Sequence, residues 1–168
     1  MKKILILLIA VVLIGLGIWC LAFRSADYKD AEFLIDGQAV KLDDGAAKYF
    51  GNELRTDLDG DGDEDVAFII THQPGGSGTF YYAVAAINTG NGYVGSDAYF
   101  LGDRIAPQVT NISQNPRHKM VVVFNFADRA AGEPMTAQPT VGKSVYLKID
   151  PQNNRWGIVE PNFEGESR

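Results

Sequence analysis

The sequence predicts an all-β fold, a single and mostly antiparallel sandwich or barrel, preceded by one N-terminal transmembrane helix. From residue 32 onward, turn-forming residues recur about every eight to twelve positions, which is the spacing of short antiparallel strands. The same region has no sustained 3.6-residue apolar period, so it does not resemble an amphipathic helix. Residues 4–23, by contrast, hold no charged side chain. The expected units are an anchor at 1–24, a tether at 25–31, a β domain at 32–160 and a C-terminal tail at 161–168.

The apolar segment is long enough to cross a membrane. Its 20 residues would form a helix about 30 Å long, which matches the hydrocarbon core of a bilayer. Lys2 and Lys3 precede it, and positive charge on that side favours a cytoplasmic N-terminus. We therefore expect a single-pass protein of the bacterial inner (cytoplasmic) membrane, held by residues 4–23, with its C-terminal domain outside the cytoplasm.

Two alternatives for this segment stay open. Cys20-Leu21-Ala22 resembles a signal-peptidase site, although the apolar run exceeds the roughly 7–15 residues of a usual signal peptide. Cys20 lies where a lipoprotein carries its lipid, but the preceding Trp19 is larger than the residue that such sites need. An uncleaved signal anchor fits the length of the segment best.

The first strands of the β domain are marked by their turns and their apolar runs. Asp36-Gly37 separates Phe33–Ile35 from Ala39–Leu42 and predicts a tight hairpin. Val66–Thr71 and Thr79–Ile87 are almost continuously apolar, so both faces of each strand should be buried and the two should lie centrally in the sheet. The other expected strands are Tyr49–Leu58, Tyr93–Leu101, Gln108–Ile112, Lys119–Phe126, Ser144–Ile149 and Arg155–Val159.

The charge distribution excludes one class of partner. The whole chain has 15 basic and 21 acidic side chains, a formal net charge of −6. Because Lys2, Lys3 and Arg24 lie in the anchor and no acid does, residues 25–168 carry 12 basic and 21 acidic groups, a net charge of −9. Nucleic-acid binding needs clustered Lys and Arg, so we expect no nucleic-acid partner. Cys20 is the one cysteine, so the β domain cannot contain a disulfide.

The segment before the first central strand has the pattern of a calcium loop. Six acids fall within the nine residues 57–65, and like charges this close are unfavourable unless they are fully solvated or meet a cation. The first three acids alternate along the chain, and Gly62 allows the sharp bend that such loops need. We predict a structural Ca²⁺ held by Asp57, Asp59, Asp61, Asp63 and Asp65, with a solvated acidic turn as the alternative.

The spacing differs from that of an EF-hand. An EF-hand needs a bidentate Glu at its twelfth position, where this chain has Phe68, and a strand rather than a helix follows the loop. The loop resembles instead the calcium loops of FG-GAP repeats in integrin-type propellers, where D-x-D-x-D-G-x-x-D runs directly into a strand. A propeller needs several copies, and the chain has one, so the resemblance extends to the loop alone.

Longer stretches resemble an uncharacterised family of small exported bacterial envelope proteins. The resemblance covers roughly residues 50–150 and rests on Asp57–Phe68, Gln73–Tyr82, Gly92–Gly95, Phe100–Gln108 and Ala127–Thr136. Members of this family are exported, some of them as lipoproteins. The resemblance implies an extracytoplasmic location and implies no particular activity.

Two Asp-Arg pairs precede proline-containing loops, and they allow two interpretations. Asp103-Arg104 and Asp128-Arg129 could each form a salt bridge that fixes a turn, which would contribute little if exposed. Together with Glu133, they could instead form a polar recognition patch, because loops often carry function.

The sequence favours a binding module over an enzyme. The chain has two histidines and no recognisable nucleophile motif, which argues against the alternative of an envelope hydrolase. We expect a membrane-anchored extracytoplasmic β module with a structural calcium loop, serving recognition or envelope maintenance. Its partner would be an envelope protein or a glycan.

Overall fold

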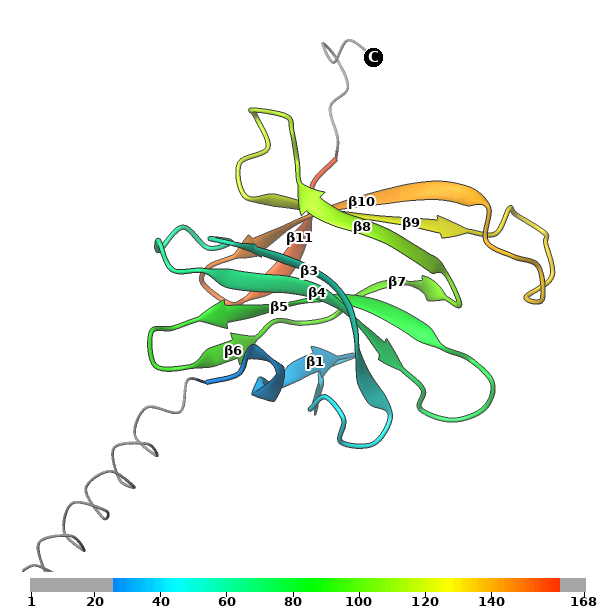
Figure 1. Ribbon diagram of the computed structural model, residues 1–168, viewed down its shortest axis with the longest axis horizontal. Helices are drawn as coiled ribbons and strands as arrows, with labels where there is room; N and C mark the ends of the chain where they lie inside the picture. The colour runs from blue at the N-terminus through cyan, green and yellow to red at the C-terminus, as the bar shows by residue number, and fades with distance from the viewer. Residues whose placement is uncertain (1–25, 161–168) are drawn as a thin grey trace, which may run out of the picture.

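A computed structural model describes residues 26–160, and these residues form an all-β fold with mostly antiparallel strands (Figure 1). The predicted fold class is confirmed at this level. The anchor predicted at 1–24 and the tail at 161–168 lie outside the described residues. Within residues 26–160, no helix is both long enough and apolar enough to cross a membrane.

The larger sheet contains the two strands that the sequence predicted to be central. Its strands are β3 (Ala47–Thr56), β4 (Asp65–His72), β5 (Phe80–Asn88) and β6 (Tyr93–Gly95), in that order, and β7 (Tyr99–Asp103) also pairs with β5. Residues 65–70 of β4 and 82–87 of β5 are buried, because both faces of these strands are covered. The prediction from their continuous apolar runs is confirmed.

A second sheet packs on one face of the larger one. Its order is β11 (Arg155–Ile158), β10 (Val141–Asp150), β9 (Val121–Asp128) and β8 (Ala106–Ile112). The main hydrophobic core lies between the two sheets and includes Leu58, Ile69, Phe124, Leu147 and Trp156.

The opposite face of the larger sheet is covered by the N-terminal part of the domain. A short 3-10 turn, η1 (Tyr28–Asp30), precedes the hairpin of β1 (Phe33–Ile35) and β2 (Gln38–Val40). Asp36 and Gly37 have φ values of 51° and 80°, so the predicted tight hairpin is confirmed. A second hydrophobic core lies between this N-terminal part and the larger sheet, and it includes Tyr28, Phe33, Phe68 and Tyr82.

The strand expected at Tyr93–Leu101 is in fact two strands. Both β6 and β7 pair with β5, and the polar segment between them leaves a gap in the edge of the sheet. In this gap the backbone N–H of Ala85 donates to Ser96 Oγ (2.8 Å). Trp156 of β11 closes the gap, since its indole N–H donates to the carbonyl oxygen of Ala83 (3.2 Å). The interruption arises because the Ser96 hydroxyl takes the place of a backbone carbonyl as the acceptor for Ala85. The Ser96 carbonyl accepts instead from Leu34 (3.1 Å), and the Asp97 carboxylate accepts from the backbone N–H of Trp156 (2.8 Å).

The folded domain begins earlier than expected, within the tether predicted at 25–31. The side chain of Asp27 accepts a hydrogen bond from the backbone N–H of Lys29 (3.0 Å) and caps η1. Tyr28 and Ala31 are buried, at 8% and 5% exposure. Residues 27–31 therefore belong to the packed domain, because their apolar side chains complete its second core.

Candidate functional site

The acidic loop joins β3 to β4, and three of its carboxylates converge. One carboxylate oxygen from each of Asp57, Asp59 and Asp61 lies within 4.8 Å of the others. Asp57 and Asp59 are half-buried, whereas Asp61 is exposed. The alternating spacing therefore brings these three side chains together, as the sequence predicted.

The loop holds this shape through hydrogen bonds from its own backbone. The carboxylate of Asp57 accepts from the N–H groups of Gly60 (2.6 Å) and Gly62 (3.2 Å), and Asp59 accepts from the N–H of Asp61 (3.1 Å). Gly60 and Gly62 have φ values of +92° and +95°, which glycine adopts without strain. The bend predicted at Gly62 is confirmed.

The two remaining predicted ligands lie outside the converging group. Asp63 is exposed, and its backbone N–H donates to Asp61 Oδ1 (2.8 Å). Asp65 is fully buried, and its carboxylate accepts from the backbone N–H groups of Leu58 and Asn88, both at 2.8 Å. Asp65 therefore fastens the start of the loop to the end of β5, a role that the sequence pattern did not indicate.

Burial raises the pKa of Asp65 above its ordinary value, and the neighbouring charges of Asp59 and Asp61 act in the same direction. The hydrogen bonds from Leu58 and Asn88 oppose this shift, since they stabilise the ionised carboxylate. The negative charges of the converging group therefore make ionisation of the buried Asp65 less favourable.

The converging group lacks a protein counter-charge within residues 26–160. The salt bridge that does reach the loop joins Arg55 to Glu64 (3.6 Å), and Arg55 also contacts Glu53 (3.3 Å). None of the salt bridges in the described part of the chain includes Asp57, Asp59 or Asp61. Three oxygen donors of this kind fit a hard divalent cation, which would remove their mutual repulsion.

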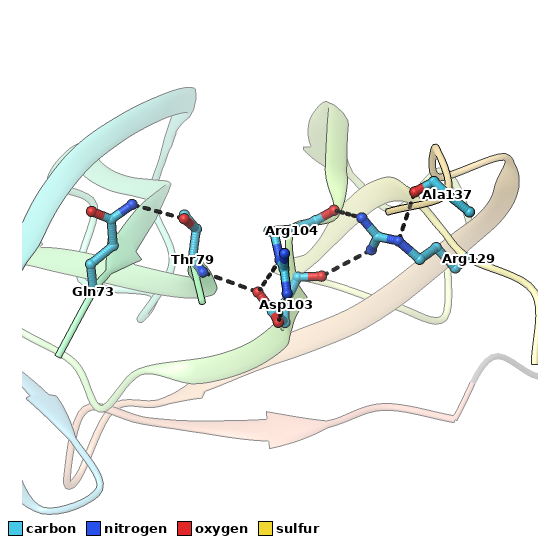
Figure 2. A network of polar contacts seen from close by, with 6 residues as sticks. All are labelled: Gln73, Thr79, Asp103, Arg104, Arg129 and Ala137. Carbon is cyan, nitrogen blue, oxygen red and sulfur yellow. Dashed lines mark hydrogen bonds and ion pairs between the residues drawn. The ribbon is translucent and has the colours of Figure 1, made fainter. Parts of the chain in front are cut away.

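A second polar cluster lies at the other end of β4 and β5, where Arg129 connects two loops (Figure 2). Its guanidinium donates to the carbonyl oxygens of Ala137 (2.8 Å), Asp103 (3.2 Å) and Arg104 (3.1 Å). On the same side, Asp103 accepts from the backbone N–H of Thr79, and the hydroxyl of Thr79 accepts from Gln73. This network holds the β4–β5 loop, the end of β7 and the 129–139 loop together.

The two Asp-Arg pairs form different contacts in the structure. Asp103 and Arg104 form the expected salt bridge (3.2 Å). The salt bridge predicted as one alternative between Asp128 and Arg129 is wrong. Asp128 forms its salt bridge with Lys143 (2.7 Å), because the pairing of β9 with β10 places Lys143 beside it. Glu133 accepts from the backbone N–H of Ala130 (2.9 Å). These side chains are used within the fold, which favours their structural interpretation.

The basic partners lower the pKa of both acids in this region. For Asp128, the hydrogen bond from Lys143 is the main cause. For Asp103, burial acts in the opposite direction, but the hydrogen bonds from Arg104 and Thr79 outweigh it and lower the pKa.

A third cluster, around Glu53, was not anticipated. The hydroxyl groups of Tyr28 and Tyr49 both donate to Glu53 Oε1, and the ammonium of Lys29 lies 4.0 Å from the centre of the Tyr49 ring. Burial and the hydrogen bond to Glu53 raise the pKa of Tyr28. Tyr28 and Glu53 are 25 residues apart in the chain, so no local pattern could reveal their contact.

The histidines do not assemble a triad within residues 26–160. Ser113 Oγ and His118 Nδ1 are 3.3 Å apart, and the His118 ring lies edge-on to Tyr146. No side-chain hydrogen bond in that range joins a carboxylate to His118, so the third member of a hydrolase triad has no candidate there.

Comparison with known proteins does not assign the chain to a family. No protein-family model, no curated protein and no solved structure matches it. The resemblance to exported envelope proteins therefore stays a prediction from the residues.

Proposed function

We propose that the chain is a membrane-anchored extracytoplasmic β module whose loop at residues 57–65 binds a structural calcium ion. The observation that carries this proposal is the convergence of Asp57, Asp59 and Asp61 at the entrance to the central strand β4. The membrane part rests on the apolar run at residues 4–23 and the lysines that precede it. An envelope protein or glycan partner stays a prediction, which capture by the full-length chain with and without calcium would test.

Calcium suits the loop better than other ions. It takes six to eight oxygen ligands in flexible geometry, whereas magnesium keeps several waters and needs fewer carboxylates. Asp57, Asp59 and Asp61 would hold the ion, together with water and backbone oxygens. We assign a structural role because two residues of the loop, Leu58 near its start and Asp65 at its end, are buried in the fold. An ion there would stabilise the connection between β3 and β4.

Thermal unfolding of the full-length protein in detergent tests this proposal. After treatment with a chelator, calcium at about 100 times its Kd should stabilise the folded state by about 2.7 kcal/mol. For a domain of this size, each kcal/mol raises Tm by about 2–4 °C, so the expected rise is about 5–10 °C. Calorimetric titration should give a matching heat of binding.

A matched pair of variants identifies the loop as the site. Asp59→Asn removes one converging carboxylate, and Asp44→Asn removes the same charge from an exposed turn elsewhere. The calcium-dependent rise in Tm should shrink strongly in Asp59→Asn and stay unchanged in Asp44→Asn. The proposal fails if the wild-type protein shows neither a Tm shift nor a heat of binding.

A further inference from the structure

Three segments meet at one end of the domain. A Cβ built on Gly92, in the β5–β6 turn, would lie 3.7 Å from the Cβ of Ala26. A Cβ built on Gly90, in the same turn, would lie 4.0 Å from Asp63 Oδ2 of the acidic loop. Figure 1 shows the start of the domain, the β5–β6 turn and the β3–β4 loop at the same end. We call residues 57–64 and 89–92 the entry end.

The chain is fixed to the domain immediately after it enters. The Tyr28 ring lies edge-on to Phe68 and Tyr93, at centroid distances of 5.4 and 6.2 Å, and its hydroxyl donates to Glu53. Asp27 caps the turn that carries Tyr28. Because Tyr28 is buried, the domain cannot swing about any residue after Asp27 without losing part of its second core.

Little chain is left between this fixed point and the apolar segment. From Phe23, the last residue of that segment, to Ala26 there are three residue steps, which span about 10 Å when fully extended. The strand β4 has eight residues and runs from the entry end to the opposite end, a length of about 25 Å. The entry end must therefore lie close to any bilayer that holds residues 4–23, whereas the opposite end can lie up to about 25 Å farther from it.

We propose that this short tether holds the entry end against the lipid headgroup layer and turns the opposite end, with its 73–79 and 129–139 loops, away from the membrane. The inference rests on the membrane anchor of the proposed function. It assigns the bilayer surface as the partner of the acidic loop and the β5–β6 turn. A partner from outside the membrane would then meet the opposite end first.

A pair of labelled variants measures this orientation. Asn91 at the entry end and Ser77 at the opposite end are both exposed, and each lies in a turn next to β5. In the full-length chain with Cys20→Ala, a fluorophore is attached to Asn91→Cys or to Ser77→Cys. The protein is placed in phosphatidylcholine nanodiscs whose headgroups carry nitroxide. Quenching should be several times stronger at position 91 than at 77, and equal or reversed quenching would overturn the proposal.

A longer tether provides the decisive control. Twelve Gly and Ser residues inserted after Ser25 would add a flexible segment with a typical span of about 20 Å. This insertion should bring the ratio of quenching at 91 to that at 77 close to one, and an unchanged ratio would show that the short tether does not set the orientation. Flotation with liposomes separates the two proposals. A chain that does not float contradicts the anchor, whereas a chain that floats with equal quenching contradicts only the orientation.

Discussion

At the end of the molecule that carries Arg129, a positive side chain is surrounded by backbone carbonyl oxygens, and the nearby acids have basic partners. At the entry end, carboxylates accept hydrogen bonds from backbone N–H groups. The converging carboxylates of Asp57, Asp59 and Asp61 form no salt bridge with a basic side chain within residues 26–160. Both ends lie at the ends of the same two strands, β4 and β5. The charged side chains at the Arg129 end have partners of opposite charge or polarity, whereas the converging carboxylates at the entry end have no basic partner in the described part of the chain.

This difference separates architecture from a binding site. A network whose donors and acceptors are already paired has little capacity for a ligand, and its loss should appear as a loss of stability. A converging group of like charges is unfavourable alone and becomes favourable when a cation arrives. The predictions below test the contrast at single residues, in the presence of a chelator.

The largest effect is expected for Asp65→Ala. This change removes the acceptor of two backbone N–H groups, the buried one of Leu58 and the half-buried one of Asn88. Each unsatisfied group costs about 1–3 kcal/mol, so the free energy of unfolding should fall by about 2–6 kcal/mol in urea titrations. Asp63→Ala, at an exposed position two residues away, should change it by less than about 0.5 kcal/mol. Equal losses in the two variants would contradict the role assigned to Asp65.

Arg129→Ala should have the next largest effect. Three carbonyl oxygens lose a charged donor, and the free energy of unfolding should fall by about 2–3 kcal/mol. Arg129→Lys keeps the charge but not the planar fork of donors, so urea titration should show that it restores only a small part of this loss. Full stability of the lysine variant would mean that charge, rather than geometry, holds the two loops together.

The salt bridge of Asp128 with Lys143 predicts a pH dependence. The pKa of Asp128 is lower in the folded protein, so its stabilising contribution is present above the unfolded pKa of about 4 and is lost as the pH falls through the folded value. The stability difference between wild type and Asp128→Asn should therefore close from about 1 kcal/mol at pH 7 towards zero as the pH falls below the lowered pKa of Asp128. Chemical unfolding at a series of pH values measures it, and a difference that grows in acid would reverse the assignment.

The smallest effect is expected at Arg104. Its salt bridge with Asp103 is partly exposed, so Arg104→Ala should cost less than about 1 kcal/mol. Arg104 has a φ of 48°, which glycine tolerates better than alanine. Arg104→Gly should therefore be at least as stable as Arg104→Ala in thermal unfolding. A glycine variant clearly less stable than the alanine variant would contradict the strain that the positive φ implies for a residue with a Cβ.

The parts of this structure that the sequence predicted are those with local causes. The continuous apolar runs of β4 and β5 require burial on both faces, and Asp36-Gly37 requires a tight turn. The alternation of Asp57, Asp59 and Asp61 brings their carboxylates together because the loop folds on its own backbone.

What the sequence could not predict depends on contacts between distant segments. Asp65 looks like a ligand in the linear pattern, but its acceptors are engaged by Leu58 and, 23 residues later, Asn88. One of the two interpretations of Asp128-Arg129 pairs these neighbouring side chains, whereas the guanidinium of Arg129 donates to backbone carbonyls, whose positions a sequence does not reveal. The burial of Tyr28 likewise depends on Glu53 and on Phe68.

Trp156 has a consequence for the order in which the chain can fold. A polypeptide made from its N-terminus has every strand of the larger sheet before it has the residue that closes the gap between β6 and β7, 73 positions after Ala83. During synthesis, the carbonyl oxygen of Ala83 therefore lacks its indole partner until the β10–β11 hairpin has been made and has folded onto the domain. Trp156 is also one of two tryptophans in the chain, the other being Trp19, so its fluorescence can time the completion of the domain.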